Sequence, residues 1–120
     1  MRNVAPFAVD VVLVIVFCAI GRRSHDEAIL AGLAKTVWPF AIGLIIGWAV
    51  AAVTARRLFG RLDGTALWPT GVLVWLGTLA GGMVLRAVSG QGVAVSFVIV
   101  AACVLALFLL GWRAAIRALR

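Results

Sequence analysis

Four long apolar runs, separated by short polar links, dominate this chain of 120 residues. They cover about residues 4–20, 33–55, 67–85 and 93–112. A helix needs about 20 apolar residues to cross the hydrocarbon core of a bilayer. Only helices and closed barrels satisfy their backbone hydrogen bonds in lipid, and alternating strand patterns are absent. We therefore predict an all-α integral membrane protein, with residues 1–120 forming a single domain, an up-down-up-down bundle of four helices.

The composition excludes an ordinary soluble domain and argues against a nucleic-acid-binding protein. Hydrophobic residues make up 65% of the chain, against about 45–50% in soluble proteins. The formal net charge is +7, but the basic residues lie in short clusters between the apolar runs and do not share one polar face. We interpret them as topology signals. The expected surroundings are the lipid bilayer, with no nucleic-acid partner.

The distribution of Lys and Arg predicts the orientation in the membrane. An even number of spans places both termini on one side, and cytoplasmic segments carry an excess of basic residues. Seven basic residues fall on the side of the termini and the middle link, and four on the other side. We therefore expect a multi-pass protein of the plasma (inner) membrane with both termini in the cytoplasm. Phe17 and Asp10 disfavour a cleaved signal peptide, so the first helix is expected to remain.

Two Gly-x-x-x-Gly pairs predict where helices pack closely. They are Gly43 with Gly47 in the second run, and Gly77 with Gly81 in the third. Small residues let the backbones of membrane helices approach one another. The spacing leaves open whether these contacts lie within one chain or between copies. A bundle this thin would bury more surface in a homo-oligomer or against a membrane-protein partner.

Asp10 is the first candidate for a functional residue, because it lies inside the first apolar run. An ionisable group there costs about 2.5–3.5 kcal/mol on the insertion scale. One hypothesis is a carboxylate that titrates protons or binds a ligand in a polar cavity. The other is a structural Asp, about 9 Å from the helix start, bonded to a neighbouring helix or to water. The sequence does not decide between them.

Arg22, His25 and Arg86 are candidates for an anion-binding site on the side opposite the termini. Arg22 and His25 belong to the densest polar link of the chain, and Arg86 ends the third run on the same side. Two guanidinium groups beside an imidazole suit a phosphate or a carboxylate. The alternatives are that these arginines contact lipid headgroups, and that Ser24 caps the next helix.

Metal, cofactor and catalytic chemistry find little support in this sequence. The two cysteines, Cys18 and Cys103, fall inside apolar runs, and the chain holds a single histidine. That set offers no plausible zinc or haem site. No nucleophile with a nearby base and no paired carboxylates appear. We expect no metal, no cofactor and no enzymatic activity.

Several features, in their order and spacing, resemble a known family over nearly the whole chain. They are Asp10, Gly21-Arg22-Arg23-Ser24-His25, Trp38-Pro39-Phe40 with Gly43 and Gly47-Trp48, Gly77-Thr78 with Gly82 and Arg86, and Gly111-Trp112-Arg113. In this pattern the chain resembles DUF3054, a family of small prokaryotic proteins with four membrane helices and no assigned activity. The resemblance implies that Asp10, Arg22, His25 and Arg86 form a retained site.

Two functions remain for this chain. The first is transport or binding of a small ligand or lipid within the bundle, with Asp10 as the titratable group. In outline this is similar to the small multidrug exporters, although Asp10 is expected nearer the cytoplasmic face than the membrane centre. The alternative is a non-catalytic accessory or assembly subunit that binds a larger membrane complex through Gly43 and Gly77.

Overall fold

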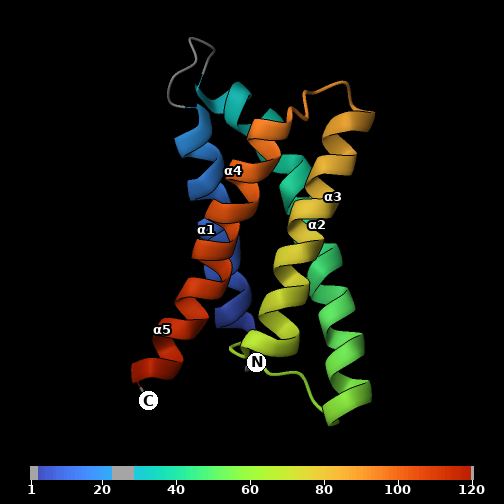
Figure 1. Ribbon diagram of the computed structural model, residues 1–120, viewed down its shortest axis with the longest axis vertical. Coiled ribbons are helices and arrows are strands. Elements are labelled where there is room, and N and C mark those ends of the chain that lie inside the picture. Colours follow the sequence, from blue (N-terminus) through green and yellow to red (C-terminus); the bar gives the residue numbers. More distant parts are fainter. Residues whose placement is uncertain (1–2, 23–28, 120) are drawn as a thin grey trace.

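The computed structural model describes residues 3–22 and 29–119, and side chains within residues 3–20 and 33–119. The chain runs up and down the bundle four times, and the described chain begins and finishes at the same end of it (Figure 1). The link after the second helix also lies at this end, which we call the terminal end. This arrangement confirms the predicted all-α fold.

The four passes are built from seven helical segments. The first two passes are α1 (Val4–Arg22) and α2 (Ile29–Phe59). The third pass joins a short segment kinked at Trp68 to an α-helix, and the fourth joins two α-helices through a π-helical turn. These segments are η1 (Leu67–Gly71), α3 (Val72–Val88), α4 (Val95–Leu105), η2 (Ala106–Leu110) and α5 (Gly111–Leu119).

Three of the four passes are long and apolar enough to cross a membrane. They are Leu33–Phe59, Leu67–Val88 and Val95–Leu119, with 27, 22 and 25 residues. Val4–Ile20 is a shorter apolar helix. Many large apolar side chains are exposed on the outer faces of the helices. Such side chains suit contact with lipid. The chain is a membrane protein.

The closest helix contact joins α2 to α3 through glycine. A Cβ atom added to Gly43 would lie 2.9 Å from the carbonyl oxygens of Gly77 and Thr78, and one added to Gly81 would lie 2.8 Å from Cα of Gly43. Gly47 and Gly77 face each other directly. The backbones approach so closely because no side chain separates them. The two Gly-x-x-x-Gly pairs therefore meet within one chain.

An aromatic cluster fills the half of the bundle away from the terminal end. Phe40 of α2 is fully buried, and its ring lies edge-on to Phe17 of α1, at 5.4 Å between centroids, and to Phe97 of α4, at 6.4 Å. Gly82 of α3 leaves the space that this ring occupies, because a Cβ there would lie 2.5 Å from a ring carbon. Edge-to-face contacts of this kind stabilise aromatic pairs. They bring three of the passes together around one side chain.

The last pass differs from the sequence prediction. The fourth apolar run was expected to end near Trp112. Instead α4, η2 and α5 follow one another without a break, and residues Gly111–Leu119 continue the helix. The physical reason is that Arg113 has a buried partner inside the bundle, so its charge does not require exposure to headgroups.

Candidate functional site

Asp10 and Arg113 form a buried ion pair near the terminal end of the bundle. Both side chains have a relative exposure of 0%. Arg113 Nη2 lies 2.7 Å from Asp10 Oδ2, and Nη1 lies 3.0 Å from Oδ1, so the contact is bidentate. The planar guanidinium matches the two carboxylate oxygens. The pair joins α1, the first helix of the chain, to α5, the last.

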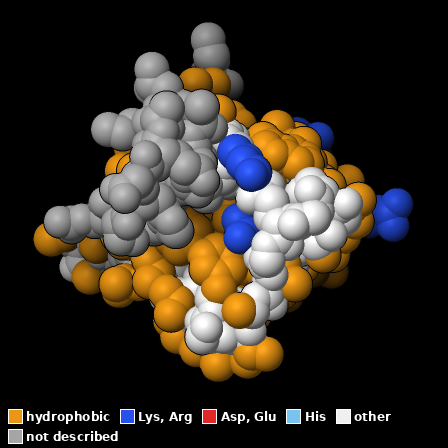
Figure 2. Space-filling view, turned by 90° about the horizontal axis from the view of Figure 1, so that it is seen from above, with side chains coloured by type: hydrophobic (Ala, Val, Ile, Leu, Met, Phe, Trp, Pro, Cys, Tyr) orange, Lys and Arg blue, Asp and Glu red, His pale blue; other side chains and the backbone are white. Residues whose placement is uncertain are grey.

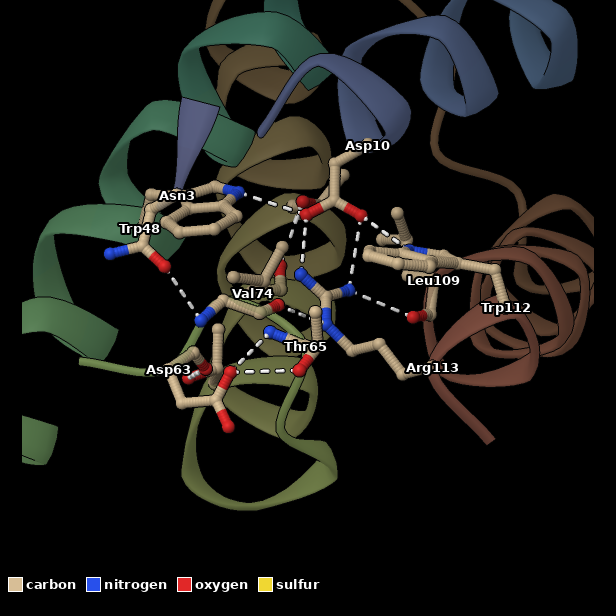
Figure 3. Close-up of polar contacts among 12 residues, drawn as sticks. Asn3, Asp10, Trp48, Asp63, Thr65, Val74, Leu109, Trp112 and Arg113 are labelled. Atoms are coloured by element: carbon tan, nitrogen blue, oxygen red, sulfur yellow. Dashed lines mark hydrogen bonds and ion pairs between the residues drawn. The ribbon is translucent and has the colours of Figure 1, made fainter. Parts of the chain in front are cut away.

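Two tryptophans complete the hydrogen bonding of the Asp10 carboxylate. Trp48 of α2 donates from Nε1 to Oδ2 at 2.9 Å, and Trp112 of α5 donates from Nε1 to Oδ1 at 2.9 Å. Figure 3 shows these indoles on either side of the carboxylate, with the Arg113 guanidinium beneath it. Four donors thus converge on one carboxylate. We call Asp10, Trp48, Trp112 and Arg113 the ion-pair centre.

Arg113 also bonds to backbone carbonyls on two sides. Its Nη1 donates to the carbonyl of Leu109 in η2 at 2.8 Å, and its Nε donates to the carbonyl of Gly64 at 2.9 Å. The Arg113 Cζ lies 4.7 Å from the Trp112 ring centroid, within reach of a cation–π contact. The guanidinium is therefore held by α1, by its own helix and by the link between α2 and η1.

That link is itself organised by polar side chains. Asn3 Oδ1 accepts from the Gly64 backbone N–H at 2.8 Å, so both sides of the Gly64 residue are bonded. Asp63 Oδ1 accepts from the Thr65 backbone N–H at 3.0 Å and from its hydroxyl at 2.8 Å. Thr70 of η1 donates to the Asp63 carbonyl at 2.7 Å. The link 60–66 thereby covers the ion-pair centre at the terminal end of the bundle.

The electrostatics of the ion-pair centre follow from its burial. A charge removed from water must be paired and hydrogen-bonded, or its desolvation is very costly. Among the described side chains, every buried nitrogen and oxygen atom has a hydrogen-bond partner. The Asp10 carboxylate thus contacts four hydrogen-bond donors.

Of the predicted site residues, the structure describes the side chains of Asp10 and Arg86, and these two lie toward opposite ends of the bundle. Arg86, at the far end of α3, donates from Nε to the Gly92 carbonyl at 3.0 Å and from Nη1 to Gln91 Oε1 at 3.1 Å. Its Cζ lies 4.6 Å from the Phe97 ring centroid. The link between α3 and α4 lies at the end of the bundle opposite the terminal end (Figure 1), and Figure 2 looks onto that end, where basic side chains lie beside backbone and uncharged side chains. His25 and the Arg22 side chain lie outside the described residues.

The described residues show no group of three or more His, Cys, Asp or Glu side chains that could hold a metal ion.

Two apolar hollows appear between or beside the helices. One, with a volume of about 90 Å³, lies between α1 and α2 and is lined by Phe7, Val11, Val14, Ile15, Val37, Ala41, Leu44 and Ile45. The second lies on α1 along Ala8, Val9, Val12 and Leu13.

Three members of the ion-pair centre, Trp48, Trp112 and Arg113, were not predicted as partners of Asp10. They were singled out only as part of the family resemblance. Trp48 lies in the core, at 8% exposure, and donates to Asp10. The sequence does hold a signal for Arg113 as the partner of Asp10. A buried carboxylate needs a cation at the same membrane depth, and Arg113 follows the fourth apolar run on the same expected membrane side as Asp10.

The family resemblance is confirmed by comparison with known proteins. Residues 7–116 match the family described as Protein of unknown function (DUF3054). No curated protein and no solved structure matches the chain.

Proposed function

We propose that this chain, which belongs to the DUF3054 family of proteins of unknown function, binds a small anionic ligand in its helical bundle and transports it. The observation that carries the proposal is the buried pair of Asp10 and Arg113. A buried ion pair is often no more stabilising than apolar side chains of the same volume. Ionisable residues inside a membrane protein commonly mark substrate or proton pathways. The pair is therefore better explained by function than by stability alone.

In this proposal, the ion-pair centre couples the binding of a proton to the binding of an anion. A proton on Asp10 would remove the negative charge that faces Arg113 and leave a buried guanidinium without a counterion. Breaking a buried pair in this way costs about 3–5 kcal/mol. A ligand carboxylate or phosphate can accept the same donors, from Arg113, Trp48 and Trp112, and so relieve that cost. Proton binding and anion binding would then favour each other, without any catalytic step.

The test is proton-linked anion movement in proteoliposomes that contain a trapped pH-sensitive dye. Succinate and phosphate serve as probe anions. We expect an anion gradient to drive proton entry with the wild-type protein, and to fail with Asp10→Asn and Arg113→Gln. Arg117→Gln is the matched control, because Arg117 is an exposed arginine four residues further along the same helix. Wild-type proton movement in Asp10→Asn, or none above empty vesicles for either probe, would contradict the proposal.

The second candidate is a non-catalytic accessory or assembly subunit, favoured by the complete hydrogen bonding of the ion-pair centre. In this case Asp10 and Arg113 only fix the position of α1 against α5. Gly43 and Gly77 already contact each other's helices within the chain, so a partner would bind other lipid-facing surfaces. Native mass spectrometry of the extracted assembly tests this candidate. Stoichiometric foreign subunits would support it, whereas a homo-oligomer with bound anion would support transport.

The proposed location is the inner (plasma) membrane with both termini in the cytoplasm. Arg56 and Arg57 end α2, Arg61 follows in the link 60–66, and Arg117 contacts Asp63 of that link, which lies at the terminal end. Cytoplasmic segments are enriched in such residues. Single cysteines placed in links 60–66 and 89–94, in a variant without Cys18 and Cys103, test this. A membrane-impermeant maleimide added to intact cells should label only the second position.

A further inference from the structure

A dense basic surface lies where α2 leaves the bundle at the terminal end. Arg56 and Arg57 occupy the last turn of α2, and Arg61 follows in the link. All three residues are exposed, and they fall within six consecutive positions, 56–61. Between them stand Leu58 and Phe59, which are 60% and 59% exposed. Charged and apolar side chains thus share one exposed stretch.

The nearest acidic side chain in the sequence is already engaged elsewhere. Asp63 accepts hydrogen bonds from the backbone N–H and the hydroxyl of Thr65. Its other oxygen lies 3.4 Å from Arg117 Nη2. Asp63 therefore already contacts Thr65 and Arg117. The stretch 56–61 itself carries three exposed arginines and no acidic residue.

We propose that Arg56, Arg57 and Arg61 form a binding surface for the headgroup phosphates of anionic phospholipids. The position of the surface supports a lipid over a soluble anion. The span Leu33–Phe59 is 27 residues long and apolar, so its last turn lies at the depth of the headgroups. There the guanidinium forks can bind phosphate oxygens in a bidentate manner. The exposed side chains of Leu58 and Phe59 can enter the acyl region beside them.

This surface is separate from the ion-pair centre and does not depend on the proposed transport function. Arg113 is buried against Asp10, whereas the three arginines of the surface are exposed. Basic residues near an anionic leaflet each contribute about fivefold in binding. Replacing all three should therefore weaken binding of anionic lipid by about a hundredfold, if their contributions are independent. Neutral lipid should bind as before.

The test is a titration of the delipidated protein in detergent with phosphatidylglycerol or phosphatidylcholine, with bound lipids counted by native mass spectrometry. We expect the wild-type protein to retain phosphatidylglycerol preferentially. The triple variant Arg56→Gln, Arg57→Gln, Arg61→Gln should lose that preference. Lys35→Gln is the control, because Lys35 is an exposed basic residue of the same helix near its other end. The single variant Arg57→Gln, with about a fivefold loss expected, provides a second reading if the triple variant unfolds.

Three results would overturn the proposal. The first is equal retention of phosphatidylglycerol and phosphatidylcholine by the wild-type protein. The second is unchanged phosphatidylglycerol binding in folded triple and single variants. The third is complete displacement of the lipid by inorganic phosphate at matched concentration, which would make a free anion the ligand. Failure of this test leaves proton movement through Asp10 unaffected, so the two proposals are judged separately.

Discussion

The side chains of Asp10 and Arg113 meet at 2.7 Å although 103 positions separate them in the chain. Their contact therefore closes the bundle, because it joins its first helix to its last. α1 and α4 otherwise make much smaller contacts with the rest of the bundle than α2 and α3 make with each other. The buried pair and the two indoles that donate to it thus join the outer helices at the terminal end, together with the bonds of Asn3 and Arg117 to the link 60–66.

Replacing Asp10 with Asn should destabilise the protein by about 3–5 kcal/mol, because Arg113 would remain buried without its counterion. Unfolding in mixed detergent micelles, followed by circular dichroism, measures this loss. The double variant Asp10→Leu, Arg113→Met removes both charges and should recover most of the stability, since apolar side chains can replace a buried pair. If the double variant is as unstable as the sum of the two single variants, the energetic coupling of the pair is refuted.

Removing one indole donor should weaken the ion-pair centre without abolishing it. Trp112→Phe and Trp48→Phe each delete an N–H that bonds to the Asp10 carboxylate. We expect a loss of about 1–2 kcal/mol for each, within the range of hydrogen bonds in membranes and to charged groups. Trp68→Phe is the control, because Trp68 is 57% exposed. Equal losses in all three variants would indicate lost ring packing and not lost hydrogen bonds.

The glycine contact between α2 and α3 should not tolerate even one added methyl group. In Gly43→Ala the new Cβ would lie 2.9 Å from two carbonyl oxygens and one backbone nitrogen, so the helices must move apart. Such overpacking costs about 1–3 kcal/mol. Thermal unfolding should show the loss for Gly43→Ala and Gly47→Ala, and none for Gly92→Ala, where no atom lies within 4 Å. If Gly43→Ala unfolds at the same temperature as the wild-type protein, α2 and α3 do not pack closely at Gly43.

The helices and their glycine contacts could be predicted because lipid leaves few alternatives. Apolar runs of span length must be helical in a membrane, and the helices must approach at small residues. The expected limits 33–55 and 67–85 accordingly fall within Ile29–Phe59 and Leu67–Val88. Whether Gly43 and Gly77 meet within one chain depends on the packing of the whole bundle, and spacing alone does not contain that information.

The ion-pair centre could be predicted only in part, because a partner in space is chosen by tertiary structure. Asp10 was identifiable from its place in an apolar run. Its partner was one of 11 basic residues, and the choice of Arg113 depends on α5 continuing as a helix to Leu119. A tail lying flat on the membrane would have carried Arg113 away. The bonds to Trp48 and Trp112 depend on the same arrangement.

Arg86 provides a final prediction that separates a structural role from a ligand-binding one. Its guanidinium bonds to Gly92 and Gln91 in the link between α3 and α4, and Gln91 in turn donates to the Lys35 carbonyl at 3.2 Å. Arg86→Ala should therefore loosen this link and raise amide hydrogen exchange in residues 89–94 by about tenfold, the effect of losing about 1.4 kcal/mol of local stability. Lys35→Ala should leave the exchange unchanged, because only the backbone of Lys35 takes part. If Arg86→Ala instead abolishes anion binding while exchange in the link stays at the wild-type rate, Arg86 belongs to a ligand site and not to the closure of this link.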